Sequence, residues 1–158
     1  MKDEDRMKQT TLCYIEKDGA YLMLHRIKKE NDENKDKWVG IGGKLEYGES
    51  PFDCIRREIK EEVALTPLSL RYCGIITFVS DLFGTEYMHL FHSNSFAGEL
   101  PTECDEGVPS WVKKSDVANL PIWEGDKIFL HLLDEETRFF SLKLVYEGDK
   151  LISHTLEF

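Results

Sequence analysis

The order of apolar and polar positions along the chain predicts several short strands and two helices. Residues 10–15 and 20–24 are apolar runs on either side of the turn sequence Lys17-Asp18-Gly19, so we expect a β-hairpin there. Residues 38–41 return to the core after a polar stretch. Two further strands are predicted over residues 68–80 and 87–96, joined by a turn at 81–86. A short strand is predicted around residues 111–112. The last two strands, over 139–146 and 150–156, form a closing hairpin through 147–149.

Two segments carry the signals of helices. Ser50 is a favourable N-cap, Pro51 suits the first helical position, and Asp53 can complete a capping box. Pro67 lies beyond the expected end of this first helix. The second helix is predicted over residues 124–135, where four apolar side chains recur at helical spacing: Ile128, Phe129, Leu132 and Leu133.

Strands with two helices placed between them predict an α+β fold, in which helices flank a mixed β-sheet as an α/β/α sandwich. Because no linker is long enough to separate two domains, residues 1–158 are expected to form a single domain. The charged residues 1–9 are expected to be frayed, and the polar residues 28–37 to form a mobile loop.

Composition narrows the range of partners. The net charge of −10 over 158 residues disfavours nucleic acid polymers and anionic membranes, so a small molecule is the expected partner. The chain opens without an apolar leader and has no Cys-x-x-Cys pair, so we expect a cytoplasmic location and reduced, buried thiols. These thiols are Cys13, Cys54, Cys73 and Cys104.

The first predicted helix carries an unusual cluster of carboxylates. Glu58, Glu61 and Glu62 fall within an arc of roughly 100° on the helix. The adjacent arc is apolar and is expected to face the core through Phe52, Ile55, Ile59 and Val63. Like charges at this spacing disfavour a bare helix, whereas a hard divalent cation such as Mg²⁺ reverses that effect. A solvated helix face is the alternative interpretation.

The residues before this helix favour the metal interpretation. Gly42 and Gly43 allow a backbone carbonyl to approach a cation closely and allow phosphate to approach the backbone. Arg57, at the edge of the acidic arc, can reach back to Glu49 and hold the loop against the helix. Metal and phosphate chemistry is therefore the leading hypothesis.

The spacing of these residues resembles the Nudix box, the motif of the Nudix hydrolase superfamily. The box reads Gly, five residues, Glu, seven residues, then Arg-Glu-apolar-any-Glu-Glu-any-Gly-apolar. One position departs from it, since Ala64 stands where the family has a glycine that closes the helix, and we expect Ala64 to extend the helix by a residue. The matching residues are Gly43, Glu49, Arg57, Glu58, Ile59, Glu61, Glu62 and Leu65.

The whole chain is similar to the MutT branch, the 8-oxo-dGTP diphosphatases, and the resemblance implies a Nudix fold and a metal site. Mg²⁺ would bind to Glu58, Glu61, Glu62 and the carbonyl of Gly42, with Mn²⁺ as an alternative ion. Glu106 matches a carboxylate that completes the metal site in some relatives or acts as the base. Any of the four glutamates could be the general base, because relatives differ on this point.

The resemblance also implies residues that contact the substrate. Trp123 and Asp126 correspond to a pair that recognises the base, while Arg26 and Lys44 lie where relatives contact phosphates. Val39 departs from the asparagine by which animal members read a purine. The alternatives are a core position for Trp123, a role for Asp126 in the first turn of its helix, and plain surface charge for Arg26.

The expected activity is hydrolysis of a nucleoside triphosphate, (8-oxo-)dGTP foremost, to the monophosphate and pyrophosphate, as in the removal of oxidised nucleotides from the pool used for DNA synthesis. A nucleotide-sugar or dinucleotide pyrophosphatase of the same superfamily is an alternative, because the box reads only the diphosphate. A non-catalytic nucleotide-binding module is another, although such proteins usually lose box glutamates. The protein is expected to be a monomer or a homodimer.

Overall fold

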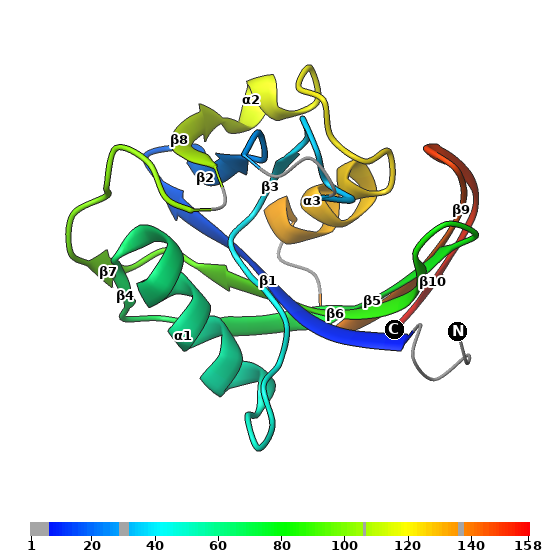
Figure 1. Ribbon diagram of the computed structural model, residues 1–158, viewed down its shortest axis with the longest axis horizontal. Helices are drawn as coiled ribbons and strands as arrows, with labels where there is room; N and C mark the ends of the chain where they lie inside the picture. The colour runs from blue at the N-terminus through cyan, green and yellow to red at the C-terminus, as the bar shows by residue number, and fades with distance from the viewer. Residues whose placement is uncertain (1–6, 29–31, 106, 136–137) are drawn as a thin grey trace.

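The computed structural model describes residues 7–28, 32–105, 107–135 and 138–158. Strands outnumber helices in it, and they build one large sheet and one small one (Figure 1). The strands in chain order are β1 (Met7–Lys17), β2 (Ala20–His25), β3 (Trp38–Val39), β4 (Thr66–Pro67), β5 (Arg71–Ser80), β6 (Gly84–Ser93), β7 (Phe96–Ala97), β8 (Val108–Lys113), β9 (Phe140–Glu147) and β10 (Lys150–Glu157).

The large sheet is mixed, as the sequence predicted. Its strands follow the order β10-β9-β5-β6-β1-β2-β3, and β8 pairs with β2 along the whole length of that strand. The pairs β1–β6 and β5–β9 are parallel, whereas the hairpins β1–β2, β5–β6 and β9–β10 are antiparallel. The parallel pairing of β1 with β6 brings the N-terminal strand to the middle of the sheet.

Helices cover both faces of this sheet (Figure 1). On one side, α1 (Pro51–Val63) packs Ile55, Ile59 and Val63 into a fully buried core cluster with β1 and β2. On the other side, α3 (Asp126–Asp134) packs Phe129 and Leu133 against the curved inner face of the sheet. A short helix, α2 (Lys114–Val117), follows β8. The α/β/α arrangement predicted from the sequence is confirmed.

The first helix has the boundaries that its capping residues predict, except at its end. The Ser50 side chain accepts a hydrogen bond from the Asp53 amide, and the Asp53 carboxylate accepts one from the Ser50 amide, which completes the capping box. Ala64 is the C-cap and adopts the left-handed conformation with φ 57°. The expectation that Ala64 extends the helix is therefore wrong, because this residue takes the backbone shape that closes it.

Other expectations need correction. Residues 7–9 belong to β1 and pair with β6, so the prediction of a frayed segment fails for them, and residues 1–6 lie outside the described part. β5 begins at Arg71 rather than at residue 68, and β6 begins at Gly84 within the segment assigned to a turn. Neither α2 nor the small sheet of β4 and β7 was predicted.

The polar segment after β2 is held by specific bonds in its described part, residues 28 and 32–37. Arg26 pairs with Asp32 at 2.7 Å, and the Asn34 side chain accepts a hydrogen bond from the Trp123 indole at 2.8 Å. Backbone bonds from Lys35 to Asp32 and from Lys37 to Asn34 close tight turns. This part of the expected mobile loop is thus a bonded turn that packs against the region before α3.

Candidate active site

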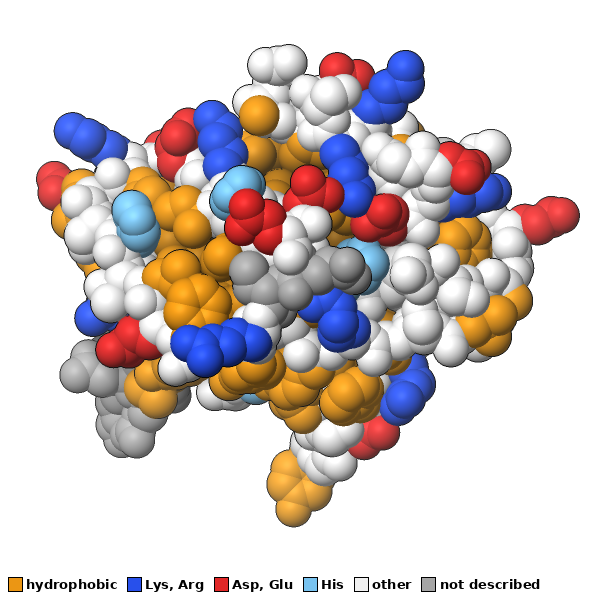
Figure 2. Space-filling model, turned by 180° about the vertical axis from the view of Figure 1, so that it is seen from behind, with side chains coloured by type: hydrophobic (Ala, Val, Ile, Leu, Met, Phe, Trp, Pro, Cys, Tyr) orange, Lys and Arg blue, Asp and Glu red, His pale blue; other side chains and the backbone are white. Residues whose placement is uncertain are grey.

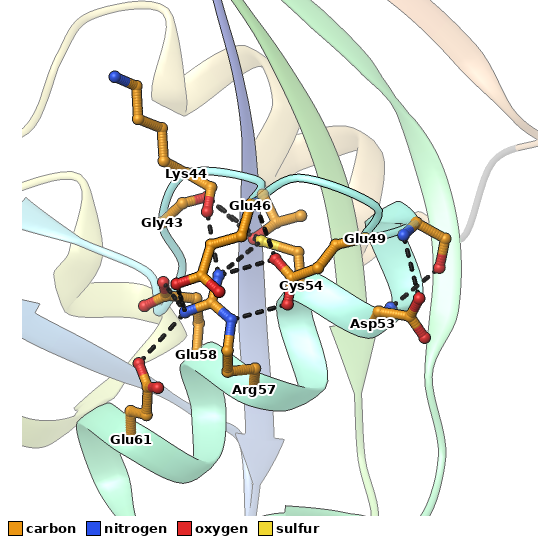
Figure 3. A network of polar contacts seen from close by, with 11 residues as sticks. Gly43, Lys44, Glu46, Glu49, Asp53, Cys54, Arg57, Glu58 and Glu61 are labelled. Atoms are coloured by element: carbon orange, nitrogen blue, oxygen red, sulfur yellow. Dashed lines mark hydrogen bonds and ion pairs between the residues drawn. The ribbon is translucent and has the colours of Figure 1, made fainter.

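Arg57 lies at the centre of a polar network between α1 and the loop before it (Figure 3). Its Nε and Nη2 atoms donate to the two carboxylate oxygens of Glu49 at 2.7 and 2.9 Å, a bidentate pair. Nη2 also donates to the Lys44 carbonyl at 3.0 Å. Arg57 therefore reaches back to Glu49, as its position in the sequence suggested, and fastens the loop to the helix.

The same guanidinium group contacts carboxylates of α1. Its Nη1 donates to Glu58 at 2.8 Å and to Glu61 at 3.2 Å. The three glutamates lie at different depths, because the side chain of Glu61 is 60% exposed, that of Glu58 is 13% exposed, and Glu62 is buried. The acidic arc thus runs from solvent to the edge of the core.

These contacts fix the charges of the network. Hydrogen bonds from Arg57, followed by one from the Glu46 amide, lower the pKa of Glu49 to about 2. The hydrogen bond to Glu49 is also the largest cause of the raised pKa of Arg57. The pair therefore stays ionised throughout the physiological range of pH.

Gly42 and Gly43 each lie too close to a neighbouring group to carry a side chain, and the neighbouring group differs between them. A Cβ atom on Gly42 would lie 1.9 Å from the Thr11 carbonyl oxygen, so the turn packs directly against the backbone of β1. A Cβ atom on Gly43 would lie 2.5 Å from the carboxylate of Glu58. The Gly43 carbonyl accepts a hydrogen bond from the Thr11 amide at 2.8 Å. The glycine turn is thus wedged between β1 and the first carboxylate of the acidic arc.

The donor set suits a hard divalent cation, although its side chains do not converge on one point. Carboxylate and carbonyl oxygens are the ligands that Mg²⁺ prefers, and the absence of a Cβ atom at Gly43 leaves the Glu58 carboxylate against the turn. Among the described residues, no group of three or more His, Cys, Asp or Glu side chains is arranged to hold a metal ion. Two carboxylates instead face Arg57, and Glu106 lies outside the described residues.

A cavity of about 190 Å³ opens beside the glycine turn, over the inner face of the sheet. Its walls include Gly42 and Gly43 from the turn and, from distant parts of the chain, Trp123 and Asp126. Val39 and Arg26 also line it. The cavity therefore joins the glycine turn before the acidic helix to the residues that the resemblance assigned to base recognition.

Trp123 and Asp126 enter this cavity from the start of α3. Trp123 is 5% exposed and packs edge-on against Phe78 and Tyr146, with ring centroids 5.2 and 5.1 Å away, so it is a core residue as well as a cavity wall. Asp126 is 6% exposed. Burial raises the pKa of Asp126 to about 8, despite the attraction of Lys37. A protonated Asp126 can donate a hydrogen bond as well as accept one.

The two basic residues expected at the phosphates lie in different surroundings. Arg26 lines the cavity and is paired with Asp32, which also lines it. Lys44 is exposed, and its side chain extends away from the carboxylates in Figure 3. Lys44 is not part of the cavity wall.

The floor of the cavity carries a carboxylate that was not predicted from the sequence. Glu86 of β6 lines it together with Thr10 and Met88. Glu86 and Met88 are two residues apart and so share one face of the strand. Glu86 alternates with the apolar residues Met88 and Leu90 along one strand, and this pattern could have indicated an acidic residue on the buried face.

A mixed sheet between helices, with a glycine turn that leads into a carboxylate-rich helix beside a cavity, is the architecture of MutT-type proteins. The chain belongs to the NUDIX domain family, whose model matches residues 6–133. It is similar to the oxidized purine nucleoside triphosphate hydrolase of Danio rerio, with 31% identity over 95% of this chain and 94% of that protein. It is also 31% identical to the Nudix hydrolase YvcI of Bacillus subtilis, over 81% of this chain and 78% of that one.

A solved structure bears out the fold. The MutT protein from Bacillus halodurans superposes with a TM-score of 0.83 and 27% identity, over 95% of this chain and 97% of that one. The family and the fold expected from the sequence are thus confirmed, and the chain is a Nudix hydrolase.

Two other expectations can be compared with the structure. All four cysteines are free; Cys13, Cys54 and Cys73 are buried, whereas Cys104 is only partly buried, so the expectation of buried thiols fails for it. Within the described ranges, no helix has the length and apolar character needed to span a bilayer.

Proposed function

We propose that the protein is a magnesium-dependent hydrolase that cleaves the diphosphate linkage of a nucleoside triphosphate, releasing the monophosphate and pyrophosphate. dGTP and 8-oxo-dGTP are the proposed substrates. The observation that carries this proposal is the cavity that Gly42 and Gly43 share with Trp123 and Asp126. One ligand can therefore contact the glycine turn beside the acidic helix and the buried residues Trp123 and Asp126 at the start of α3.

The residues divide into those that act on the phosphates and those that position others. Glu58, Glu61 and Glu62, with the Gly42 carbonyl and Glu106, would hold the cation, and Arg57, anchored on Glu49, positions Glu58 and Glu61. When bound, magnesium neutralises charge on the phosphates and makes a bound water more acidic.

The hydrolytic step needs a base close to the attacking water. Glu61 or Glu62 orients or deprotonates that water, with Glu58 and Glu106 as the other candidates. The water oxygen forms a bond to a phosphorus of the α–β linkage, the bridging P–O bond between the monophosphate and the pyrophosphate breaks, and the carboxylate takes the proton. Arg57 donates hydrogen bonds to the carboxylates of Glu58 and Glu61. To act on the ligand, these two side chains therefore have to turn away from Arg57.

The cavity also supports a purine as the base. Trp123 and Phe78 provide aromatic walls, and Asp126 provides a buried hydrogen-bonding group. The Danio rerio relative is named for oxidised purine nucleoside triphosphates, which agrees with this choice. Val39 lines the cavity but has no group that can read a purine edge, so recognition has to come from other side chains.

The test is a comparison of products and substrates. Turnover of 8-oxo-dGTP, dGTP, dATP and ADP-ribose is measured with Mg²⁺, and pyrophosphate and orthophosphate are assayed separately. We expect pyrophosphate from the triphosphates, with 8-oxo-dGTP or dGTP preferred. Orthophosphate as the first product, or a preference for ADP-ribose, would contradict the proposal, and nucleotide binding without turnover would favour a non-catalytic module.

Variants assign the chemistry to the acidic helix. Glu62→Gln is expected to reduce kcat by about 100-fold or more, because a general base or metal ligand is lost. Glu157→Gln on β10 removes one exposed carboxylate at the edge of the sheet and is expected to keep wild-type rates. Wild-type turnover by Glu62→Gln would remove that residue from the site.

A further inference from the structure

Glu86 is a charged residue in an apolar row, and the proposed hydrolysis does not use it. In the sheet it is in register with Lys8 of β1 and Phe78 of β5. Phe78 and Met88 line the cavity beside it. An acidic side chain on this floor costs burial energy unless a partner or ligand compensates for it.

The carboxyl group of Glu86 has a fixed orientation. The Thr10 hydroxyl donates a hydrogen bond to its Oε2 atom at 2.8 Å. Glu33, which pairs with Lys8 at 3.1 Å, lies on the loop side and also lines the cavity. Burial, followed by the neighbouring Glu33 carboxylate, raises the pKa of Glu86 to about 7.

Asp126 provides a second and independent sign that the cavity takes a polar ligand. Its side chain is only 6% exposed and lines the cavity. Among the described residues, none donates a hydrogen bond to its carboxyl group. Buried polar groups normally have partners, so this one is positioned to receive a partner from a ligand.

The chemistry of these two carboxyl groups matches one kind of nucleobase. A protonated carboxyl group donates one hydrogen bond and accepts others, whereas an ionised one only accepts. An amino purine presents exocyclic N–H donors next to a ring nitrogen, which complements such groups. These carboxyl groups offer phosphate no cation, and the Glu33 carboxylate, which also lines the cavity, would repel it, so this part of the cavity suits the base.

We infer that Glu86 is a second base-reading residue, which accepts a hydrogen bond from the exocyclic amino group of a purine while Asp126 contacts the adjacent ring nitrogen. The inference rests on the proposed function for the nucleotide itself and narrows the substrate class to amino purines. Thr10 acts as a positioning residue, because its hydroxyl orients the Glu86 carboxyl group.

Equilibrium binding of monophosphates tests this without any turnover. Calorimetric titration compares dGMP with dIMP, which lacks the amino group, and dAMP with the corresponding unsubstituted purine nucleotide. We expect the wild-type protein to bind the amino member of at least one pair about 10-fold more tightly. Glu86→Leu is expected to reduce that ratio to within about 3-fold, whereas Glu86→Gln, which keeps an acceptor oxygen, retains most of it.

Matched variants separate base reading from charge and from structure. Glu124→Gln removes a carboxylate that is 61% exposed next to α3 and should leave the ratio unchanged. Thr10→Ser keeps the hydroxyl and should preserve the ratio, whereas Thr10→Val should weaken it. If Glu86 were merely structural, Glu86→Leu would move the unfolding midpoint but not the ratio.

The outcomes for the two proposals differ. Equal binding within both pairs by the wild-type protein, or an unchanged ratio in Glu86→Leu, overturns the inference even where triphosphates are hydrolysed. Discrimination by the amino group without hydrolysis supports the inference and overturns the proposed function. Failure to bind any of the four nucleotides overturns the inference as well.

Discussion

At the scale of single residues, alanine substitution of the two neighbouring glycines, Gly42 and Gly43, should destabilise the fold to different degrees. Gly42→Ala places a Cβ atom 1.9 Å from the backbone oxygen of Thr11, which cannot move without displacing β1. We expect it to destabilise the fold by about 3 kcal/mol. Gly43→Ala meets only the carboxylate of Glu58, the end of a flexible side chain, and should cost less than about 1 kcal/mol.

Gly43→Ala, which has the smaller expected effect on stability, should have a large effect on kcat. Because Gly43→Ala displaces Glu58, it should lower kcat by about 100-fold in a protein that remains folded. Urea unfolding and turnover of the same two preparations are the measurements. A Gly43→Ala variant with wild-type kcat would show that the position of Glu58 does not matter for the reaction.

Asp126 should make stability depend on pH in a way that an asparagine does not. Its pKa rises from an ordinary 3.8 to about 8 on folding, so between these values the folded protein holds a proton that the unfolded chain releases. Stability from this group is therefore greatest below pH 4 and is lost as the pH rises to 8. The advantage of Asp126→Asn over wild type should grow by at most about 1.4 kcal/mol per pH unit across that window.

Urea unfolding of both proteins at pH 5 and pH 7 measures this difference. Glu86 also has a raised pKa, but it is present in both proteins, so most of its contribution cancels. A stability difference that is the same at the two pH values would contradict the shifted titration of Asp126.

The residues of the candidate site differ in how far the sequence could predict them. The spacing of Glu58, Glu61 and Glu62 on one helix is local, so the periodicity alone placed them on a common arc. Glu86 comes together with Thr10 and Asp126 only through the pairing of β6 with β1 and the packing of α3. The turn was predicted to reach residue 86, whereas β6 begins at Gly84. Glu86 was therefore not recognised as a strand residue that faces the cavity.

At the scale of elements, the end of α1 offers a direct test of helix closure. Ala64 adopts a left-handed conformation that an L-residue with a Cβ atom disfavours. Ala64→Gly should therefore stabilise the protein by about 1 kcal/mol. Ala118 caps α2 in the right-handed conformation with φ −64° and is exposed like Ala64, so Ala118→Gly is the matched control and should be slightly destabilising.

Urea denaturation of the two glycine variants gives the comparison. A loss of stability in Ala64→Gly would mean that the greater freedom of glycine in the unfolded chain outweighs the relief of the left-handed backbone. A gain of equal size at both sites would show that the effect is not due to backbone conformation.

The elements that were predicted well have strong local signals. The capping box at Ser50 fixes the start of α1, and the apolar spacing of residues 128–133 fixes the buried face of α3, which begins at Asp126 rather than at the predicted residue 124. β4 and β7 have two residues each and exist only because segments 30 residues apart pair with one another. Pairing of that kind depends on the assembled fold, so no local pattern could indicate it.

At the scale of the whole molecule, the distribution of charge matters more than its sum. The face seen in Figure 2 has acidic and basic side chains interspersed among apolar ones, whereas the carboxylates of Glu49, Glu58 and Glu61 all contact Arg57. A triphosphate approaching a chain with a net charge of −10 is repelled at long range, so the substrate should bind better as salt is raised to physiological strength.

Magnesium should stabilise the folded protein through α1 and not through its general acidity. A ligand that binds only the folded state at 100 times its Kd adds about 2.7 kcal/mol, and each kcal/mol raises Tm by about 2–4 °C in a chain of this size. Thermal unfolding with and without MgCl₂, at ionic strength matched with NaCl, measures the effect, and EDTA should reverse it. Glu58→Gln should lose most of the rise in Tm, because Glu58 lies against the glycine turn. Glu157→Gln on the far strand β10 removes one negative charge as well, but it should keep the rise. An equal rise in all three proteins would mean that the cation stabilises the fold at sites that do not need Glu58, and the acidic arc would then lose its role as the metal site.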